Sequence, residues 1–326
     1  MIVVTGAAGF IGSAFVWQLN TMGIEDITVS DKLRTEEKWL NLAKRKYYDW
    51  VDKDNLFEYL ETTTEKITAI IHMGACSATT EKDMDFLMEN NYEYTKKLWD
   101  YSVKNDVVFI YASSAATYGG GELGYDDEIG LDGHNLLRPL NKYGYSKKIF
   151  DVWALKQEKT PRKWFGLKYF NVYGPQEYHK GRMASMVFHA FNQYNAEKEV
   201  KLFKSHKDGY KDGYQLRDFV YIKDVTNVMY FLMKDDSAPN GVYNLGTGGA
   251  RAFYELAKLT VEATDGDINN IKFVDMPEDL RGKYQYFTEA KMDKLKKAGY
   301  NKGFTSLEDG VKDYVQNYLM KEDKYL

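Results

Sequence analysis

A tyrosine and a lysine four residues apart are the pair best suited to proton transfer in this chain. Tyr143 and Lys147 lie in the run Tyr-Gly-Tyr-Ser-Lys, and residues at this spacing share one face of a helix. Tyrosine is a weak base near neutral pH because its reference pKa is about 10, but a nearby ammonium favours the phenolate and lowers that pKa. Ser114 follows an apolar run earlier in the chain and can hold the reacting oxygen. The alternative is an amphipathic helix without chemistry, so the prediction depends on what accompanies the pair.

A glycine-rich turn near the N-terminus predicts a phosphate-binding site. Gly6, Gly9 and Gly12 follow the apolar run Ile2–Val4 and are followed by apolar residues at helical spacing. Such a turn lets the backbone approach a pyrophosphate, and the helix N-terminus offers free N–H groups to the anion. Asp31 ends the next apolar run, at the place where an acidic residue binds the adenosine ribose in dinucleotide-binding folds. The pattern therefore predicts a nicotinamide dinucleotide.

The residues after the second apolar run bear on which dinucleotide binds. Asp31 favours NAD, because a carboxylate hydrogen-bonds the ribose 2′-OH. Lys32, Arg34 and Lys38 follow at once, and these cations would attract the 2′-phosphate of NADP, although charge runs are often solvated loops. We expect NADP and leave NAD open. Lys147 would then hydrogen-bond the nicotinamide ribose as well.

Short apolar runs alternating with helical patterns must position these residues. Runs separated by helical segments imply right-handed crossovers and a parallel sheet, and such a sheet binds its ligand beyond the carboxyl ends of its strands. The chemistry is therefore expected in the turns that follow the strands. The candidate strands are Ile2–Val4, Ile27–Val29, Ala69–Met73, Val107–Tyr111 and Phe165–Phe170.

The second half of the chain is less regular. The pattern predicts a helix over Met183–Tyr194, a flexible loop over Lys204–Gln215 and a further strand over Val242–Leu245. We expect an α/β fold with a doubly wound parallel sheet (Rossmann) and a smaller, discontinuous C-terminal substrate domain. The expected NADP-binding domain comprises residues 1–170 plus about 218–248, and the substrate domain comprises 171–217 plus about 249–326.

Composition excludes several classes of function. The 326 residues carry 44 Lys and Arg against 48 Asp and Glu, a net charge of −4 that argues against nucleic-acid binding. No apolar run is long enough to cross a membrane. A strand pattern begins at the N-terminus and leaves no room for a presequence, and the single cysteine, Cys76, suits a reducing compartment, so we expect a cytoplasmic protein. Five histidines without an i, i+4 pair, and no CxxC, predict no metal site.

These motifs resemble the extended short-chain dehydrogenase/reductase superfamily, which acts on nucleotide sugars. The later runs Arg217–Val225 and Asn244–Gly248 are similar to signatures of that superfamily. Within it, nearly the whole chain is similar to the family of ADP-L-glycero-D-manno-heptose 6-epimerases. The segments that carry this narrower resemblance are His72–Ser77, Thr79–Glu81, Ser113–Gly120, Asn171–Gly181 and Leu280–Gln285.

The residues after Ser114 narrow the reaction that the resemblance implies. Nucleotide-sugar dehydratases of the superfamily carry an acidic pair there, whereas this chain has Ala115 and Ala116. Oxidation to an acid would need a nucleophilic cysteine, and Cys76 is expected near the cofactor as a small buried residue. Epimerisation remains, in which a hydride leaves one face of the sugar carbon and returns to the other. Each face then needs an acid or base: Tyr143 is one, and the resemblance implies Lys180 as the second.

The resemblance implies that ADP-D-glycero-D-manno-heptose and its L-glycero epimer interconvert through a 6-keto sugar with bound NADP, for lipopolysaccharide core synthesis. It also implies a homo-oligomer, a pentamer. Arg182, in place of a small hydroxyl residue, and a long loop over 204–215 depart from the family pattern. The expected substrate contacts are Ser114, Asn171, Arg182, His189, Phe203, Arg217 and Tyr284. The expected cofactor contacts are Gly6, Gly9, Phe10, Ile11, Gly12, Asp31, Lys32, Lys38, Lys53, Met73, Gly74, Ala75, Cys76, Ser77, Asn90, Lys147 and Val172.

Two other readings stay open from the sequence. A UDP-hexose 4-epimerase would share the alanine pair after Ser114, although the His-Lys-Gly run at Lys180 fits the heptose enzymes better. A nucleotide-binding regulator without catalysis could use the same fold. Such a protein has no need of Ser114, Tyr143 and Lys147, so their presence speaks against it.

Overall fold

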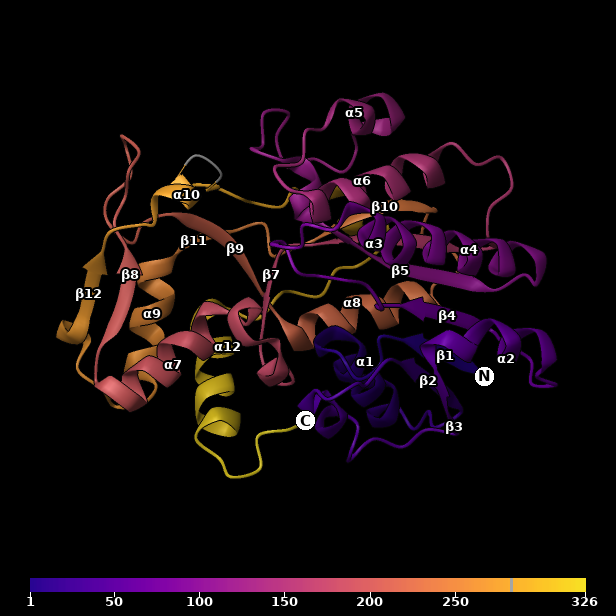
Figure 1. The fold of residues 1–326 in the computed structure, drawn as a ribbon, viewed down its shortest axis with the longest axis horizontal. Coiled ribbons are helices and arrows are strands. Elements are labelled where there is room, and N and C mark those ends of the chain that lie inside the picture. Colours follow the sequence, from indigo (N-terminus) through magenta and orange to yellow (C-terminus); the bar gives the residue numbers. More distant parts are fainter. Residues whose placement is uncertain (282–283) are drawn as a thin grey trace.

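A seven-stranded parallel sheet forms the larger part of the molecule. The computed structural model describes residues 1–281 and 284–326. The strand order is β10-β6-β5-β4-β1-β2-β3. Successive strands are added on one side of β1 up to β3 and on its other side from β4 onward, so the topological switch point lies between β1 and β4, where such sheets bind ligands. Figure 1 shows this part at the right of the view. The strands are β1 (Ile2–Thr5), β2 (Ile27–Asp31), β3 (Asp49–Asp52), β4 (Ala69–His72), β5 (Val108–Ser114), β6 (Trp164–Tyr169) and β10 (Gly241–Leu245).

Helices cover both faces of this sheet because its strands are apolar on both sides. Ile2 and Val4 of β1 pack into one core with α1 (Phe10–Thr21) and α8 (Ile222–Lys234). Val3 packs into a second core on the opposite face, since successive side chains of a strand alternate. The helices around that second core are α2 (Leu56–Thr62), α4 (Tyr94–Lys104) and α6 (Lys142–Leu155).

The observed sheet confirms the doubly wound fold and the six predicted strands to within a few residues. The sequence did not predict β3, a short strand at the sheet edge that begins and ends with an aspartate. The predicted strand at Val107–Tyr111 extends to Ser114, so Ser114 lies at the carboxyl end of β5. That place is the one expected for a residue that acts on a bound ligand.

A smaller part holds two short sheets and most of the later helices (Figure 1). β7 (Asn171–Tyr173), β9 (Leu216–Tyr221) and β11 (Ala250–Ala252) form one sheet, in the order β11-β9-β7. β8 (Val200–Phe203) and β12 (Ile271–Val274) pair in parallel. β9 lies in the smaller part, whereas α8 directly after it packs on the large sheet. The helices here are α7 (Met186–Glu197), α9 (Phe253–Glu262) and α12 (Leu307–Tyr314).

The remaining elements are short. They are α3 (Met84–Met88), α5 (Gly130–Leu136), α10 (Glu278–Arg281), α11 (Asp293–Lys297), the 3-10 turns η1 (Glu37–Asn41), η2 (Lys53–Asn55), η4 (Ala115–Tyr118), η5 (Tyr178–Met183) and η6 (Ile268–Asn270), and the π-helical turns η3 (Glu89–Glu93) and η7 (Val315–Leu319). Among the described residues, no helix is long and apolar enough to cross a membrane.

One predicted helix boundary is wrong. The helix expected to begin at Met183 begins at Met186, because the Ser185 hydroxyl accepts a hydrogen bond from the Phe188 N–H and caps it. Residues 178–183 form the separate 3-10 turn η5 instead. The segment Lys204–Gln215 is a loop between β8 and β9, as predicted.

Candidate active site

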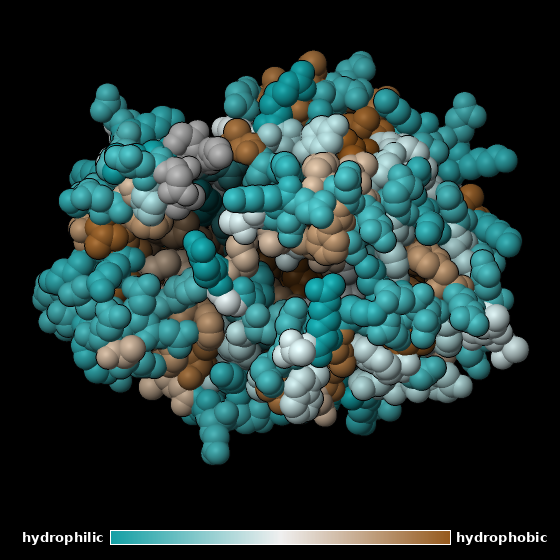
Figure 2. Space-filling model, in the orientation of Figure 1, coloured by the Kyte–Doolittle hydropathy of each residue, from teal (hydrophilic) through white to brown (hydrophobic). Residues whose placement is uncertain are grey.

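A cavity of about 1170 Å³ opens between the two parts of the molecule. The space-filling view shows a polar surface that is hollowed between them (Figure 2). One wall consists of the carboxyl ends of β1, β2, β4, β5 and β6, and residues of α6, β7, η5, α7, β8 and α9 also line the cavity. The cavity therefore lies where a doubly wound sheet places its ligand.

The glycine-rich turn is packed too tightly for side chains. Gly6 has a φ of +62°, and a Cβ there would lie 2.5 Å from the backbone N of Gly74. A Cβ on Gly12 would lie 2.2 Å from the carbonyl oxygen of Gly6. The turn therefore brings the N-terminus of α1 against β4 and leaves backbone N–H groups at the cavity, a geometry that fits the pyrophosphate of a dinucleotide.

Asp31 at the end of β2 links the glycine-rich turn to Lys38. Its Oδ2 accepts a hydrogen bond from the Ala8 N–H at 2.9 Å, and its Oδ1 lies 2.9 Å from the Lys38 ammonium. Both residues line the cavity. Lys32 does not line it and pairs instead with Asp54 and, at 3.4 Å, with Asp52. Of these two lysines, only Lys38 is placed to meet a group bound beside Asp31.

Lys53 and Asn90 lie together, but not among the cavity-lining residues. The Lys53 ammonium donates to Oδ1 of Asn90 and lies 5.0 Å from the centre of the Tyr94 ring. Burial lowers the pKa of Lys53. The structure thus joins two residues that are far apart in sequence and that only the family resemblance had connected with the cofactor.

Ser114, Tyr143 and Lys147 all line the cavity. Tyr143 and Lys147 share the first turns of α6, which begins where the Asn141 side chain accepts a hydrogen bond from the Gly144 N–H at 2.7 Å. Ser114 ends β5, and its hydroxyl oxygen accepts a hydrogen bond from the Ala116 N–H at 3.1 Å. The hydroxyl proton is therefore left for another acceptor.

The pKa shifts in this group differ from the sequence-based expectation. Burial raises the pKa of Tyr143 to about 12, and the Ser114 hydroxyl opposes that rise. Burial also lowers the pKa of Lys147 to about 8, although the nearby carboxylate of Asp151 acts to raise it. The expected lowering of the tyrosine pKa is wrong for this structure because desolvation of the phenolate outweighs the opposing hydrogen bond from Ser114.

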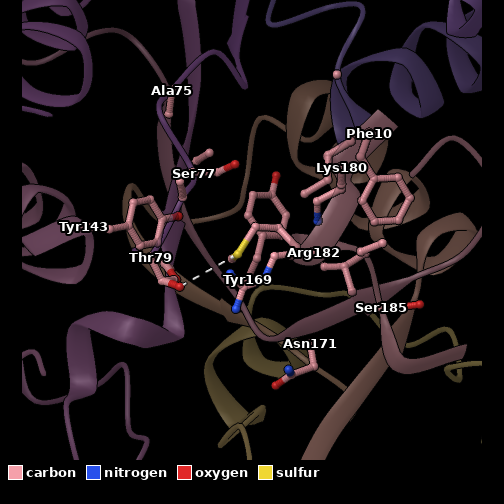
Figure 3. A pocket seen from close by; sticks show the side chains of 18 of the residues that line it. Phe10, Ala75, Ser77, Thr79, Tyr143, Tyr169, Asn171, Lys180, Arg182 and Ser185 are labelled. Carbon is pink, nitrogen blue, oxygen red and sulfur yellow. Dashed lines mark hydrogen bonds between the residues drawn. The ribbon is translucent and has the colours of Figure 1, made fainter. Parts of the chain in front are cut away.

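Lys180 faces Tyr143 across the cavity. Figure 3 shows the Tyr143 hydroxyl and the Lys180 ammonium directed from opposite sides towards the space between them. The Lys180 ammonium lies 5.1 Å from the centre of the Phe10 ring, which begins α1. Burial lowers the pKa of Lys180, and the buried carboxylate of Glu177 opposes that change. A lysine whose pKa moves towards neutrality is a better proton carrier.

The expected substrate residues other than Ser114 belong to the smaller part of the molecule, and all of these except Arg217 line the cavity. Asn171, Arg182, His189, Phe203 and Tyr284 line it. Arg217 does not, and its guanidinium donates to the carbonyl oxygens of Leu216 and Gln285 while lying 5.4 Å from the Phe253 ring and 5.2 Å from the Tyr284 ring. Burial lowers the pKa of Arg217.

The structure brings most of the predicted site together. The predicted residues that line the cavity are Gly6, Gly9, Phe10, Ile11, Gly12, Asp31, Lys38, Met73, Gly74, Ala75, Cys76, Ser77, Ser114, Tyr143, Lys147, Asn171, Val172, Lys180, Arg182, His189, Phe203 and Tyr284. Those that do not line it are Lys32, Lys53, Asn90 and Arg217. In the run Leu280–Gln285, Gly282 and Lys283 lie outside the described residues.

Several lining residues were not selected from the sequence. Thr79, Tyr169 and Ser185 also line the cavity (Figure 3), and the Thr79 hydroxyl lies 4.0 Å from the Met183 sulfur. Tyr169 ends β6, so its place at a strand end was the signal that could have identified it. His179 also lines the cavity, and burial lowers its pKa to about 4.

Two other features bear on the chemistry. Ala115 and Ala116 begin the 3-10 turn after Ser114, so this turn brings no carboxylate to the site. Cys76 is half-buried in the cavity wall, and burial raises the pKa of its thiol, which disfavours the reactive thiolate. Within residues 1–281 and 284–326, no group of His, Cys, Asp and Glu is placed to hold a metal ion.

Comparison with known proteins gives consistent matches along the chain. Residues 2–246 match the NAD dependent epimerase/dehydratase family. The chain is 62% identical to the ADP-L-glycero-D-manno-heptose-6-epimerase of Fusobacterium nucleatum and 50% identical to that of Nitratidesulfovibrio vulgaris, each over 100% of both chains. The crystal structure of the Helicobacter pylori ADP-L-glycero-D-manno-heptose-6-epimerase is 30% identical and superposes with a TM-score of 0.79, covering 97% of this chain and 95% of that one.

Proposed function

Because the chain belongs to the NAD dependent epimerase/dehydratase family, we propose that it interconverts ADP-D-glycero-D-manno-heptose and ADP-L-glycero-D-manno-heptose. The full-length identity of 62% to an enzyme of that name carries this assignment. The reaction would supply the heptose of the lipopolysaccharide core. The assignment is supported by a cavity lined by the glycine-rich turn and by two side chains able to carry protons, Tyr143 and Lys180.

The residues around the cavity divide the chemistry between two faces of the sugar. A bound nicotinamide dinucleotide supplies the acceptor and donor of the hydride. The Lys147 ammonium stabilises the phenolate form of Tyr143, which takes the proton of the C6 hydroxyl on one face and becomes the neutral phenol, while the Ser114 hydroxyl holds the reacting oxygen. After the side-chain carbonyl rotates, Lys180 exchanges the proton on the other face. Two carriers are needed because the hydroxyl points in opposite directions in the two epimers.

Other reactions of the family fit the site less well. A dehydratase needs an acid to expel a hydroxyl, and Ala115 and Ala116 stand in the turn after Ser114. Oxidation to an acid needs a thiolate, and burial raises the pKa of the Cys76 thiol. The UDP-glucose 4-epimerase of Thermus thermophilus is 24% identical with a TM-score of 0.75, a likeness of fold alone.

We assign NADP as the dinucleotide. Lys38 lies beside Asp31 at the cavity, where its ammonium can meet a 2′-phosphate. The same lysine neutralises the Asp31 carboxylate, which would otherwise repel that phosphate. The cavity-lining residues that would hold the dinucleotide are the glycine turn with Phe10 and Ile11, the segment Met73–Ser77 and Lys147.

The remaining parts of the assignment follow the resemblance. The cofactor would bind to residues 1–170 and about 218–248, and the sugar nucleotide to 171–217 and about 249–326. The expected boundary between residues 217 and 218 falls within β9, a strand that pairs with β7 and β11 of the smaller part. The proposed enzyme is a cytoplasmic homo-oligomer, a pentamer, and light scattering of the purified protein measures that state directly.

Proton NMR of ADP-D-glycero-D-manno-heptose incubated with the purified protein and no added cofactor tests the function. Appearance of the L-glycero epimer would support both the reaction and a tightly held dinucleotide. If nothing changes, NADP and then NAD are added, followed by UDP-hexoses in place of the heptose. Turnover of a hexose without turnover of the heptose would refute the proposal in favour of a 4-epimerase.

A further inference from the structure

The last residues of the chain cross from the smaller part of the molecule to the nucleotide-binding part. After the π-helical turn η7, the chain runs back beside α1, where the C-terminus lies in Figure 1. The Lys44 ammonium pairs with Asp323 and donates to the carbonyl oxygen of Tyr325 at 3.1 Å. The Arg45 guanidinium donates to a main-chain oxygen of Leu326, whose side chain is buried. We call the segment Asp323–Leu326 the strap.

The strap also contacts the turn that carries Lys180. The Tyr178 hydroxyl donates to the carbonyl oxygen of Lys324 at 2.5 Å. The Tyr325 ring meets the Tyr178 ring edge-on, with centres 5.2 Å apart, and the Lys324 ammonium lies 4.8 Å from the Tyr178 ring centre. Tyr178 is thus held on one edge of its ring, over its face and at its hydroxyl, two residues before Lys180.

A second set of contacts reaches the turn through Gln176. This residue is fully buried and has a φ of +84°, a conformation that a non-glycine residue adopts only when its surroundings hold it there. Its side-chain oxygen accepts a hydrogen bond from the Leu326 N–H at 3.3 Å, and its side-chain nitrogen donates to the Asn41 carbonyl at 3.0 Å. The Asn41 amide in turn donates to the Ala8 carbonyl in the glycine-rich turn at 2.9 Å.

We propose that the strap positions Lys180 for proton transfer. The proposal rests on the proposed function, in which Lys180 serves one face of the sugar. The two residues that the strap holds, Gln176 and Tyr178, lie four and two positions before Lys180. The turn η5 that begins at Tyr178 and carries Lys180 follows β7 as a separate 3-10 element and is not itself part of a strand. Packing by the strap therefore adds to the support that Tyr178 receives from Phe188 and Tyr314, whose ring centres lie 5.8 Å and 6.4 Å from its own.

The strap does not reach the other proton carrier. Tyr143 is on α6, which packs against the large sheet, and its position is set by that core. Loss of the strap should therefore impair one half of the reaction. Because a displacement of about 1 Å at a reacting group can cost about 10²-fold in rate, the effect should be large enough to measure.

Rapid mixing with each epimer separately tests this asymmetry. The cofactor-loaded enzyme is mixed with one epimer, and the first reduction of the bound nicotinamide is followed by absorbance. We expect Tyr325→Ala to slow that step by about 10- to 100-fold for one epimer and to leave the other unchanged. The slowed epimer should be the one slowed by Lys180→Met. Tyr325→Phe keeps the ring against Tyr178 and should behave as wild type, while Tyr178→Phe loses only the hydrogen bond to Lys324 and should show a smaller effect of the same kind.

A second measurement does not depend on turnover. Hydrogen–deuterium exchange of the chain without added substrate should be faster over residues 177–183 in Tyr325→Ala and unchanged over α8. The proposed role of the strap would be overturned if Tyr325→Ala slowed the first reduction step equally for both epimers. It would also be overturned if both Tyr325→Ala and Tyr178→Phe showed wild-type rates. If Lys180→Met shows no preference for one epimer, the proposed role of Lys180 fails instead, and exchange over 177–183 alone then decides whether the strap holds the turn.

Discussion

The Lys168 ammonium lies 2.8 Å from Oδ2 of Asp151, and neither side chain has exposed surface. Asp151 also accepts hydrogen bonds from the hydroxyls of Tyr111 at 2.9 Å and Ser113 at 2.7 Å, and Lys168 donates to the Thr117 hydroxyl at 2.5 Å. The pair therefore joins β5 and β6 to α6 directly behind the site. It sets the distance between the strand end that carries Ser114 and the helix that carries Tyr143.

Removal of one partner of this pair should destabilise the fold. Lys168→Met leaves the Asp151 carboxylate buried without a counter-ion, which should lower the free energy of unfolding by about 3–5 kcal/mol. Urea unfolding followed by circular dichroism measures the loss. Asp151→Asn in the same chain should recover part of it, because the buried charge is then gone. A loss below about 1 kcal/mol would contradict this account.

Tyr143→Phe should remove the proton carrier without disturbing the nucleotide-binding turn. We expect the rate of epimer interconversion to fall by about 10²- to 10⁴-fold, with the cofactor still bound to the purified protein. Tyr145→Phe is the matched control, since Tyr145 lies on the exposed face of the same helix. Near-normal turnover by Tyr143→Phe, measured by NMR, would exclude Tyr143 from the mechanism.

Lys180→Met should block interconversion to a similar extent, because the second face of the sugar would lack a proton carrier. The control is Lys258→Met, a substitution in α9 at an exposed side chain that pairs with Glu262 at 3.7 Å. Both variants are assayed from each epimer by NMR. Full activity of Lys180→Met would leave a scheme with one base.

The basic residues after β2 should favour NADP over NAD. Neutralising Lys32, Arg34 and Lys38 together should weaken the binding of NADP more than that of NAD, and titration calorimetry of the two cofactors measures this. Among single substitutions, Lys38→Met should have the larger effect, because Lys38 lines the cavity whereas Lys32 pairs with Asp52 and Asp54. Equal weakening of both cofactors would show that the cluster is a solvated loop.

A buried histidine should make the fold sensitive to acid. Burial lowers the pKa of His134 to about 4, from 6.5 in an exposed state. The unfolded chain therefore binds a proton between pH 6.5 and 4 that the folded chain does not, and stability falls as the pH falls through that window. Between pH 7 and 5 this costs about 1–2 kcal/mol. His134→Asn can keep the hydrogen bond to Gly130, and its urea stability should fall less over that range. Parallel curves for the two proteins would contradict the assignment.

The local pattern of the sequence predicted six of the seven strands of the large sheet and missed β3 at its edge. The glycine spacing, the apolar runs of β1, β2, β4, β5, β6 and β10, and the i, i+4 pair of Tyr143 and Lys147 are all properties of short segments. Such segments determine their own secondary structure and the order of crossovers, because strand and helix periodicities and the handedness of connections depend on few residues. The family resemblance added Lys180, and the cavity contains it.

Only the tertiary structure decided which distant residues meet and what burial does to them. Lys53 hydrogen-bonds Asn90, Lys168 forms an ion pair with Asp151, and the ring of Tyr325 packs against that of Tyr178. The two members of each pair are brought together only by the packing of their elements. The sequence indicated a lowered pKa for Tyr143, whereas burial raises it to about 12. Contacts of this kind depend on how whole elements pack, and desolvation depends on everything that surrounds a group, so neither can be read from the spacing of residues along the chain.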